Sequence, residues 1–261
     1  MFYEAPPEAA IPSFPRGGPA PPLHTETSSG AVKRTVARCS ACARRSVCIP
    51  SDLSVAQIAR LDTFVRDTRH VRRGQPLYLA GDRFQNFYAI RTGSFKFLTV
   101  HRDGIEQISS FFVAGETLGL DGVSSGSHAG EAVALEDSSA CVIPFAMLEA
   151  FCAESPAMQR YLHRLMSEEI VRQAALVMLL GTMKAEQRVA AFLLSLSERV
   201  GGRGYPRSEL ELRMSREEIG NYLGLKLETV SRMLSKLTRQ GLVEIRAKQI
   251  RIVDFGALAR V

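Results

Sequence analysis

Hydrophobic residues between positions 76 and 144 follow the pattern of short strands. Aromatic and β-branched runs alternate with polar positions, and turn glycines recur about every eleven residues, at Gly81, Gly93, Gly104 and Gly115. Turn signals at this interval are typical of an antiparallel sandwich or a small barrel. The pattern predicts strands over residues 87–90, 94–98, 107–112 and 139–143, with a hairpin turn at 102–104.

Helical spacing flanks this strand-rich segment on both sides. Apolar residues recur at helix-compatible intervals over residues 51–64, where Ser51 or Ser54 can act as the N-cap. After the strands, Ser155 followed by Pro156 predicts a second helix start, with serine as the cap and proline in the first turn.

The helix after Pro156 carries apolar residues at gaps of three and four, which is the spacing of a coiled-coil seam. We expect it to pair with the same helix of a second copy, because it is longer than the preceding sandwich could cover. Packing on its own domain is the alternative. The seam would consist of Leu162, Met166, Ile170, Gln173, Val177 and Leu180.

The last third of the chain contains the most specific local pattern. After a helix expected over residues 186–199, Ser215 and Glu218 match the capping box S-x-x-E, and Gly224 lets the chain turn sharply into a second helix. A β-hairpin is expected over residues 241–253. Two short helices joined in this way and followed by a hairpin predict a winged helix-turn-helix.

Glu228, Ser231 and Arg232 project from one face of the second helix, since they lie at i, i+3 and i+4. Arginine can donate to O6 and N7 of guanine, glutamate can accept from N4 of cytosine, and serine can contact a base or a phosphate. The alternative is a solvated Glu228–Arg232 ion pair of little energetic consequence. Candidate phosphate contacts, each of which could equally be ordinary surface, are Lys236, Arg239, Arg246 and Lys248.

The charge distribution supports a nucleic-acid partner for this third of the chain. The net charge is +6, and residues 184–261 hold 15 Lys and Arg against 9 Asp and Glu, whereas residues 1–183 hold 18 of each. A basic terminal domain beside a neutral one suits binding to a phosphate backbone, although a basic solvated surface without a partner would look the same.

Composition bounds the class of protein. A content of 46% hydrophobic and 23% charged residues is ordinary for a globular protein. We expect a cytoplasmic location, because no apolar run could span a bilayer and the N-terminus lacks the pattern of a signal peptide. Residues 1–35 are rich in proline, glycine and serine and are expected to form a disordered tail.

Three of the five cysteines lie within ten positions. Cys39, Cys42 and Cys48 have the spacing C-x2-C-x5-C, and in a reducing compartment such thiols are more often metal ligands or redox groups than disulfides. A four-coordinate thiolate site needs one more ligand, which Cys141 or Cys152 could supply. The spacing by itself suits zinc and an iron-sulfur cluster about equally.

The order of these parts resembles the CRP/FNR superfamily of bacterial transcription regulators, and specifically its FNR branch. The resemblance extends over residues 38–258 and rests on the cysteine motif followed by Ile49-Pro50 and on two stretches of the helix-turn-helix, Ile-Gly-Asn-Tyr-Leu-Gly-Leu (219–225) and Glu-Thr-Val-Ser-Arg (228–232). It implies an α+β chain with a β jelly roll like that of cyclic-nucleotide-binding domains. The implied domains are the tail (1–35), the cysteine segment with the roll (36–152), a dimerisation helix (153–183) and a winged helix-turn-helix (184–261).

The resemblance also implies a cofactor and a function. An oxygen-labile 4Fe-4S cluster would be held by Cys39, Cys42, Cys48 and Cys141, while Cys152 matches no ligand and should be a buried apolar residue. The protein would not be an enzyme but a homodimeric regulator. It would bind double-stranded DNA at palindromic sites of the form TTGAT, four spacer bases, ATCAA, and act on RNA polymerase at anaerobic or microoxic promoters. The hairpin at 102–104 is a candidate polymerase contact.

Three departures or alternatives remain. Cyclic nucleotide is not expected, because Gly115-Glu116 is present but residues 121–141 contain no Arg or Lys to pair with a phosphate. FNR proteins can carry an acid at the seam position occupied here by neutral Gln173, so the dimer should depend less on the cluster. Lys226 stands where a Thr or Ser cap is expected. The rival functions are a constitutive regulator with structural zinc, a regulator that responds to cyclic nucleotide, and an iron-sulfur or electron-transfer protein.

Overall fold

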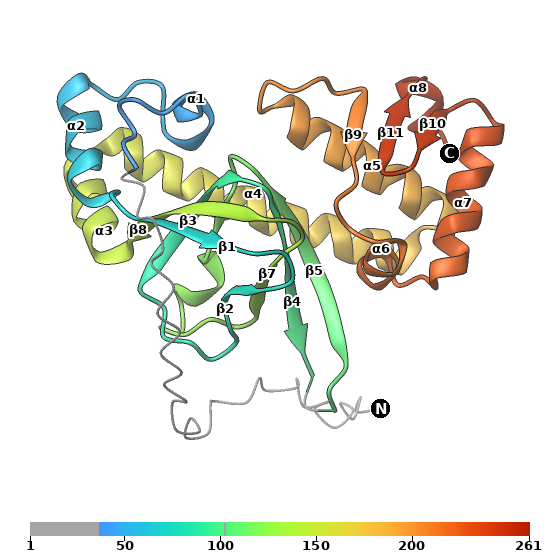
Figure 1. Cartoon of the computed structure of the whole chain (residues 1–261), viewed down its shortest axis with the longest axis horizontal. Helices are drawn as coiled ribbons and strands as arrows, with labels where there is room; N and C mark the ends of the chain where they lie inside the picture. Colours follow the sequence, from blue (N-terminus) through green and yellow to red (C-terminus); the bar gives the residue numbers. More distant parts are fainter. Residues whose placement is uncertain (1–36, 102) are drawn as a thin grey trace, which may run out of the picture. The chain divides into compact units, whose positions relative to one another are not determined.

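The computed structural model describes residues 37–101 and 103–261 (Figure 1). The expected tail and Arg102, the first residue of the expected hairpin turn, therefore lie outside the described residues. No helix of the described part is long and apolar enough to cross a membrane.

Two four-stranded antiparallel sheets form the β roll, with strand orders β1-β8-β3-β6 and β2-β7-β4-β5. The expected strands are confirmed as β3, β4, β5 and β8, and the shorter strands of the roll were not predicted. The strands are β1 (Thr68–Val71), β2 (Pro76–Tyr78), β3 (Asn86–Thr92), β4 (Ser94–Val100), β5 (Glu106–Val113), β6 (Thr117–Leu118), β7 (Glu131–Ala134) and β8 (Ser138–Pro144). A core that includes Ile90, Phe95 and Ala140 lies between the sheets.

Helices precede and follow the roll. The helix expected from residue 51 begins later, because Ser54 makes a reciprocal capping box with Gln57. Ser155 accepts a hydrogen bond from the Met158 amide at the start of the long helix, as predicted. These helices are α1 (Arg45–Cys48), α2 (Val55–Phe64), α3 (Phe145–Glu154) and α4 (Pro156–Thr182), with a 3-10 turn, η1 (Leu120–Gly122), inside the roll.

The last third is the predicted winged helix-turn-helix. Ser215 and Glu218 form the capping box of α6, and Gly224 ends that helix in the left-handed conformation (φ 62°). The elements are α5 (Ala185–Gly201), β9 (Glu209–Glu211), α6 (Arg216–Leu223), α7 (Leu227–Arg239), β10 (Val243–Arg246), β11 (Gln249–Ile252) and α8 (Phe255–Leu258). The unpredicted β9 extends the wing to a three-stranded sheet of order β10-β11-β9.

The winged helix packs on strand β5 of the roll. Phe111 of β5 meets Phe192 of α5 and Tyr222 of α6, with ring centroids 6.0 and 5.2 Å apart. Asn221 of α6 accepts a hydrogen bond from the Ile108 amide (2.6 Å) and donates one to the Glu106 carbonyl (2.9 Å). Aromatic packing and satisfied strand-edge groups thus join the two halves of the chain.

Candidate functional site

Four cysteines from two distant segments line one internal cavity of about 70 Å³. Cys39, Cys42 and Cys48 come from the segment before α2, and Cys141 comes from β8. A water molecule needs about 10–15 Å³ by the same measure, so the space is several times larger. The structure therefore brings together the four thiols that the resemblance assigned as ligands.

Local hydrogen bonds shape the cysteine segment. The Cys42 amide donates to the Cys39 carbonyl (3.3 Å), and the Arg45 amide donates to the Cys42 carbonyl (3.1 Å), so successive tight turns precede α1. The Ser40 amide donates to a carboxylate oxygen of Asp62 on α2 (3.2 Å). The Ser40–Asp62 bond therefore ties the segment to α2.

Strand alternation orients Cys141. Its neighbours Ala140 and Val142 pack in the core of the roll, so Cys141 lies on the opposite face of β8, as predicted. Cys152 lies on α3 in a core with Phe151, against which Cys39 also packs, but Cys152 does not line the cavity. It is a buried residue, as expected.

Burial controls the charge of the thiols in the metal-free chain. It raises the pKa of Cys39 to about 12 and that of Cys48 to about 11, with Asp62 adding to the effect at Cys39. Burial also raises the pKa of Cys141, against the lowering effect of Arg91. Thiolates in this cavity therefore need a cation among them, as metal ligation would supply.

The four cysteines of this cavity are not arranged as a single-ion site. Zinc bound at about 2.3 Å from each sulfur requires thiolates within about 4 Å of one another. Within residues 37–101 and 103–261, no group of three His, Cys, Asp or Glu residues converges closely enough to hold one ion. Arg38, Arg44 and Arg45 line the same cavity as the four cysteines.

The recognition helix α7 presents its polar face outward. Glu228 and Arg232 are exposed and Ser231 is half-buried, while Val230 and Leu234 face the core. Arg232 donates to the Thr229 hydroxyl (3.3 Å), and no ion pair joins it to Glu228 in the described structure. The solvated Glu–Arg pair that was the alternative to base contacts is therefore not formed here.

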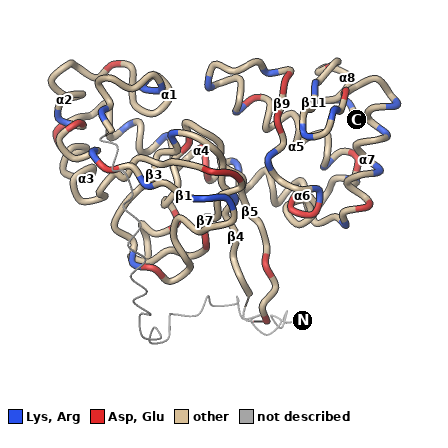
Figure 2. Tube along the Cα trace, in the orientation of Figure 1, with Lys and Arg blue, Asp and Glu red and all other residues tan. Residues whose placement is uncertain are grey.

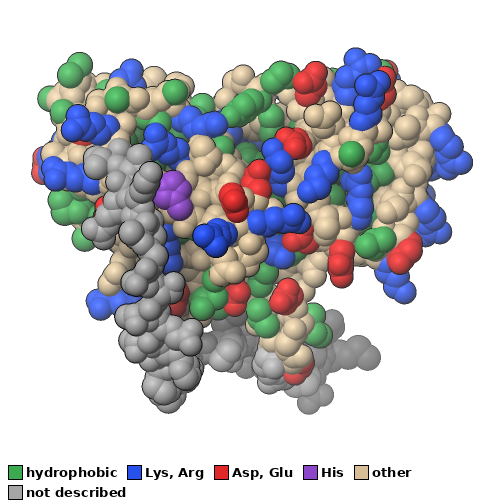
Figure 3. All heavy atoms as spheres, viewed as in Figure 1, with side chains coloured by type: hydrophobic (Ala, Val, Ile, Leu, Met, Phe, Trp, Pro, Cys, Tyr) green, Lys and Arg blue, Asp and Glu red, His purple; other side chains and the backbone are tan. Residues whose placement is uncertain are grey.

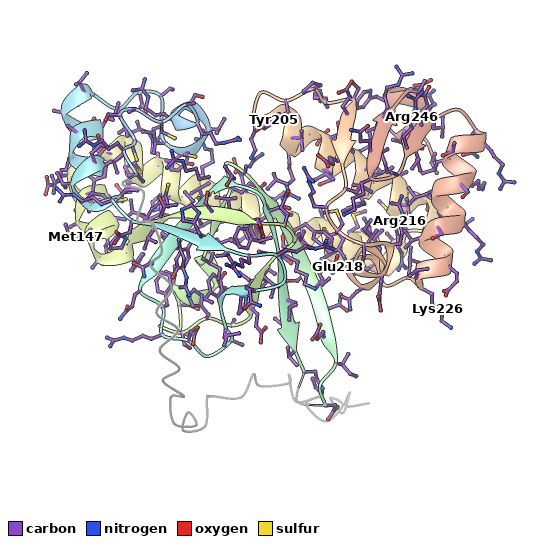
Figure 4. The ribbon with its side chains drawn as sticks, in the orientation of Figure 1. Met147, Tyr205, Arg216, Glu218, Lys226 and Arg246 are labelled. Atoms are coloured by element: carbon purple, nitrogen blue, oxygen red, sulfur yellow. The ribbon has the colours of Figure 1, made fainter. Side chains whose placement is uncertain are left out.

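Basic positions recur along α7 and the wing, with acidic positions among them (Figures 2 and 3). Lys226 takes the N-cap position of α7 without a side-chain cap bond, and both it and Arg246 of the wing are labelled in Figure 4. Arg239, Arg246 and Lys248 are exposed, whereas Lys236 is ion-paired with Glu186. Lys236 would have to leave that pair to reach a phosphate.

Glu116 in the Gly115-Glu116 turn is buried in an ion-pair cluster that the sequence reasoning missed. Its carboxylate accepts hydrogen bonds from Arg199 of α5 and from Arg203, and Arg172 of α4 lies 3.7 Å away. We call these four residues the Glu116 cluster. Burial raises the pKa of Glu116, but the three guanidiniums outweigh it and lower the pKa to about 2.

The three arginines do not share this carboxylate equally. Glu116 raises the pKa of Arg199 in spite of burial, whereas burial and the neighbouring guanidiniums lower that of Arg203. Arg199 is thus the main partner. The sequence does contain a signal for this cluster, because Glu116 lies within an apolar run. A carboxylate buried in such a run requires a cation from elsewhere in the chain.

The predicted seam is divided between the surface and the interior of this single chain. Ile170 and Val177 are 69% and 70% exposed, and their neighbours Val171 and Met178, which the seam did not include, are also exposed. Met166 and Gln173 line a pocket between the roll and α4, whereas Leu162 and Leu180 pack against the protein's own cores. The exposed apolar residues of α4 form a stripe of the kind that packs against a second helix. The six residues proposed for the seam stay a prediction.

Comparison with known proteins gives two family matches and close relatives. Residues 68–155 match the cyclic nucleotide-binding domain, and residues 187–261 match the Crp-like helix-turn-helix domain. The chain is 42% identical to the transcriptional regulatory protein btr of Bordetella pertussis, over 86% of this chain and 93% of that one. It is 39% identical to the fumarate and nitrate reduction regulatory protein of Escherichia coli, over 85% and 89%. The structure of FixK2 from Bradyrhizobium japonicum superposes with a TM-score of 0.68 at 31% identity, covering 74% of this chain and 95% of that one.

Proposed function

Because this chain belongs to the FNR branch of the CRP/FNR family, whose members are transcription regulators and not enzymes, we propose that it is an oxygen-responsive regulator of transcription. In this proposal Cys39, Cys42, Cys48 and Cys141 hold a 4Fe-4S cluster that promotes the dimeric, DNA-binding state. The observation that carries the proposal is that these four cysteines, from two distant segments of the chain, line one cavity.

The thiols tie the cysteine segment to the roll. When bound, the cluster would supply an oxygen-labile link between Cys39, Cys42 and Cys48 on one side and Cys141 on the other. Four thiolates give such a cluster a net negative charge, which Arg38, Arg44 and Arg45 would offset. Loss of ligation frees the segment from β8, and the chain then keeps only the hydrogen bonds and packing described above to hold it in place.

The exposed face of α7 would read DNA. We propose that Arg232 donates to guanine and Glu228 accepts from cytosine, and that Ser231 contacts a neighbouring base or phosphate. A TTGAT half-site offers the G·C pair that such contacts require. Two α7 helices related by a dimer axis would bind half-sites one helical turn apart, as the proposed palindrome demands.

The proposed partners follow from the same parts. A second copy would pack on the exposed stripe of α4, and RNA polymerase would contact the dimer bound at the promoter. Cyclic nucleotide would not be the effector, because Glu116 of the Gly-Glu turn is already paired with arginines and residues 121–141 offer no cation for a phosphate. As a regulator of chromosomal promoters, the protein would act in the cytoplasm.

The test is anaerobic purification followed by exposure to air. We expect iron and acid-labile sulfide in equal amounts, a 4Fe-4S absorbance that bleaches in air, and a parallel loss of affinity for a TTGAT-N4-ATCAA duplex. A duplex with the guanine of each half-site replaced is the matched control. Zinc without iron or sulfide would leave a constitutive regulator with a structural metal, and bleaching without a change in DNA affinity would favour an electron-transfer role.

A further inference from the structure

Residues 201–205, which comprise the end of α5 and the first part of the connection to β9, contact the cysteine segment of the same chain. We call them the 201–205 loop. The Arg44 Nη2 donates a hydrogen bond to the Tyr205 hydroxyl at 2.6 Å, and the guanidinium carbon lies 5.6 Å from the centre of the tyrosine ring. Arg44 stands between the candidate ligands Cys42 and Cys48, whereas Tyr205 belongs to the winged helix-turn-helix (Figure 4). A side chain of the cysteine segment thus contacts the winged helix-turn-helix directly.

A second contact lies over Gly115. A methyl group on Gly115 would be 3.1 Å from Val47 of α1 and 3.3 Å from the side chain of Arg203, so both side chains pack closely on this glycine. Its φ of 92° also requires glycine. The cysteine segment and the 201–205 loop therefore meet above the Gly115-Glu116 turn.

The loop is also the place where the winged helix is held to the roll. Arg203 continues from Gly115 to the Glu116 carboxylate, where its Nη2 lies 2.9 Å from Oε1, and Arg199 at the end of α5 binds the same carboxylate. A shift of the cysteine segment would change the packing around Arg203 directly, without any movement of α4. Through Tyr205 and Arg203, a change in the position of the cysteine segment would thus alter contacts of the DNA-binding domain.

We infer that the 201–205 loop reads the ligation state of the cysteine segment directly, through Arg44 and Val47, in addition to any effect on dimerisation. This inference rests on the proposed function, since it assumes that the four cysteines are ligated together in one state and released in another. With the segment docked, Arg44 and Val47 hold the loop in the orientation that favours DNA binding. With the segment released, the loop loses these contacts while the Glu116 cluster remains, so the response is graded.

The test compares two neighbouring arginines in the full-length, anaerobically loaded protein. Arg44→Ala removes the contact with Tyr205. Arg45→Ala removes the same charge from the lining of the same cavity, but Arg45 has no side-chain hydrogen bond or ion pair in the described structure. Tyr205→Phe breaks the hydrogen bond from the other side and leaves the cysteine segment unchanged, so it stays informative if Arg44→Ala loads poorly.

Hydrogen exchange of the loop amides is the readout that does not depend on DNA. The amides of Arg203, Gly204 and Tyr205 donate to carbonyls within the same turn, so their exchange reports on the loop. We expect faster exchange in the wild-type protein after cluster loss, and a smaller increase in loaded Arg44→Ala and Tyr205→Phe, which keep the Val47 contact. Affinity for the duplex should fall by about threefold in Tyr205→Phe, which loses one hydrogen bond, and by about tenfold in Arg44→Ala, which also loses the cation–π contact, with dimerisation unchanged.

The outcomes separate this inference from the proposed function. A wild-type chain that takes up no iron and sulfide overturns both. A loaded wild-type chain whose loop exchanges alike with and without the cluster overturns only the direct contact, as does an Arg45→Ala variant that matches Arg44→Ala in exchange and affinity. Loss of affinity that follows dissociation to monomers in every variant would assign the coupling to α4 alone.

Discussion

Replacing Glu116 by glutamine should destabilise the folded chain strongly, although the substitution nearly preserves the shape of the side chain. The Glu116 side chain is 3% exposed, and its carboxylate also accepts the Val113 amide (2.8 Å) in addition to the arginine contacts. Glutamine would turn an amide group toward guanidinium donors and remove the negative charge that bridges the roll, α4 and the winged helix at this point. Arg172 would keep its ion pair with Glu169 (2.9 Å), but Arg199 and Arg203 would lose the carboxylate that they share.

The pKa of Glu116 gives the size of the effect. A fall from 4.5 to about 2 on folding means that the ionised form is bound more favourably in the native state. At about 1.4 kcal/mol for each pH unit, this corresponds to about 3 kcal/mol of stability at neutral pH. Removing one member of a buried ion pair typically costs about 3–5 kcal/mol, which agrees.

The pH dependence follows from the direction of the shift. Because folding lowers the pKa of Glu116, the ionised carboxylate contributes its full stabilisation at pH values above 4.5, the pKa in the unfolded state. This stabilisation is lost as the pH falls toward about 2, the pKa in the folded state. Urea unfolding followed by circular dichroism should therefore show Glu116→Gln less stable by about 3 kcal/mol at pH 7 and by about 2 kcal/mol at pH 3.5. The slope of the unfolding free energy with urea should be the same in both proteins.

An exposed acid provides the matched control. Glu154 pairs with Arg60 at the surface, so Glu154→Gln should leave the unfolding midpoint close to that of the wild type. A Glu116→Gln protein within about 1 kcal/mol of the wild type at pH 7 would refute the ion-pair account, because the cost of breaking a buried pair exceeds this value. A difference between the two proteins that does not shrink on acidification would refute the assigned pKa.

Three further outcomes are expected. Cys141→Ser should abolish the uptake of iron and sulfide, as measured by metal analysis, while Cys152→Ser retains it, because of these two cysteines only Cys141 lines the cavity. Equal uptake by the two variants would exclude Cys141 as a ligand. Arg232→Ala should lower affinity for the proposed half-site by about 1–3 kcal/mol and relax the preference for its guanine, whereas Lys248→Ala should weaken binding to all duplexes alike in a salt titration. Metal-free wild-type protein should retain dimers in sedimentation at micromolar concentration, since the seam position 173 carries a neutral glutamine; complete dissociation to monomers would contradict this expectation.

The predictions from sequence held where the controlling interactions span a few residues. The starts of α4 and α6 follow from Ser155 and Ser215, because a cap is made by a side chain and an amide within three residues. The helix-turn-helix followed from such local signals, and the choice between Ser51 and Ser54 for α2 was settled by Gln57, three residues after Ser54.

Spacing alone could not choose the fourth ligand. Cys141 and Cys152 were equivalent candidates on residue type, and only the resemblance favoured Cys141. Strand alternation turns Cys141 toward the cavity, while the packing of α3 buries Cys152 in the adjoining core, away from the cavity lining. The difference arises from which faces of β8 and α3 meet the rest of the chain, which no local pattern records.

The sequence by itself thus determined helices α2, α4, α5, α6 and α7, the main strands, the cysteine motif and the basic last third, since these depend on short-range periodicity and composition. It gave no prediction for α1, α3 and α8. Tertiary structure decided which distant groups meet. Arg44 and Tyr205 are 161 residues apart and Glu116 and Arg199 are 83 residues apart, yet both pairs form because Phe111, Phe192 and Tyr222 pack the winged helix against β5. A carboxylate in an apolar stretch of sequence indicates that a cation must lie nearby in the folded chain. Only the packing of the core determines which arginine supplies it.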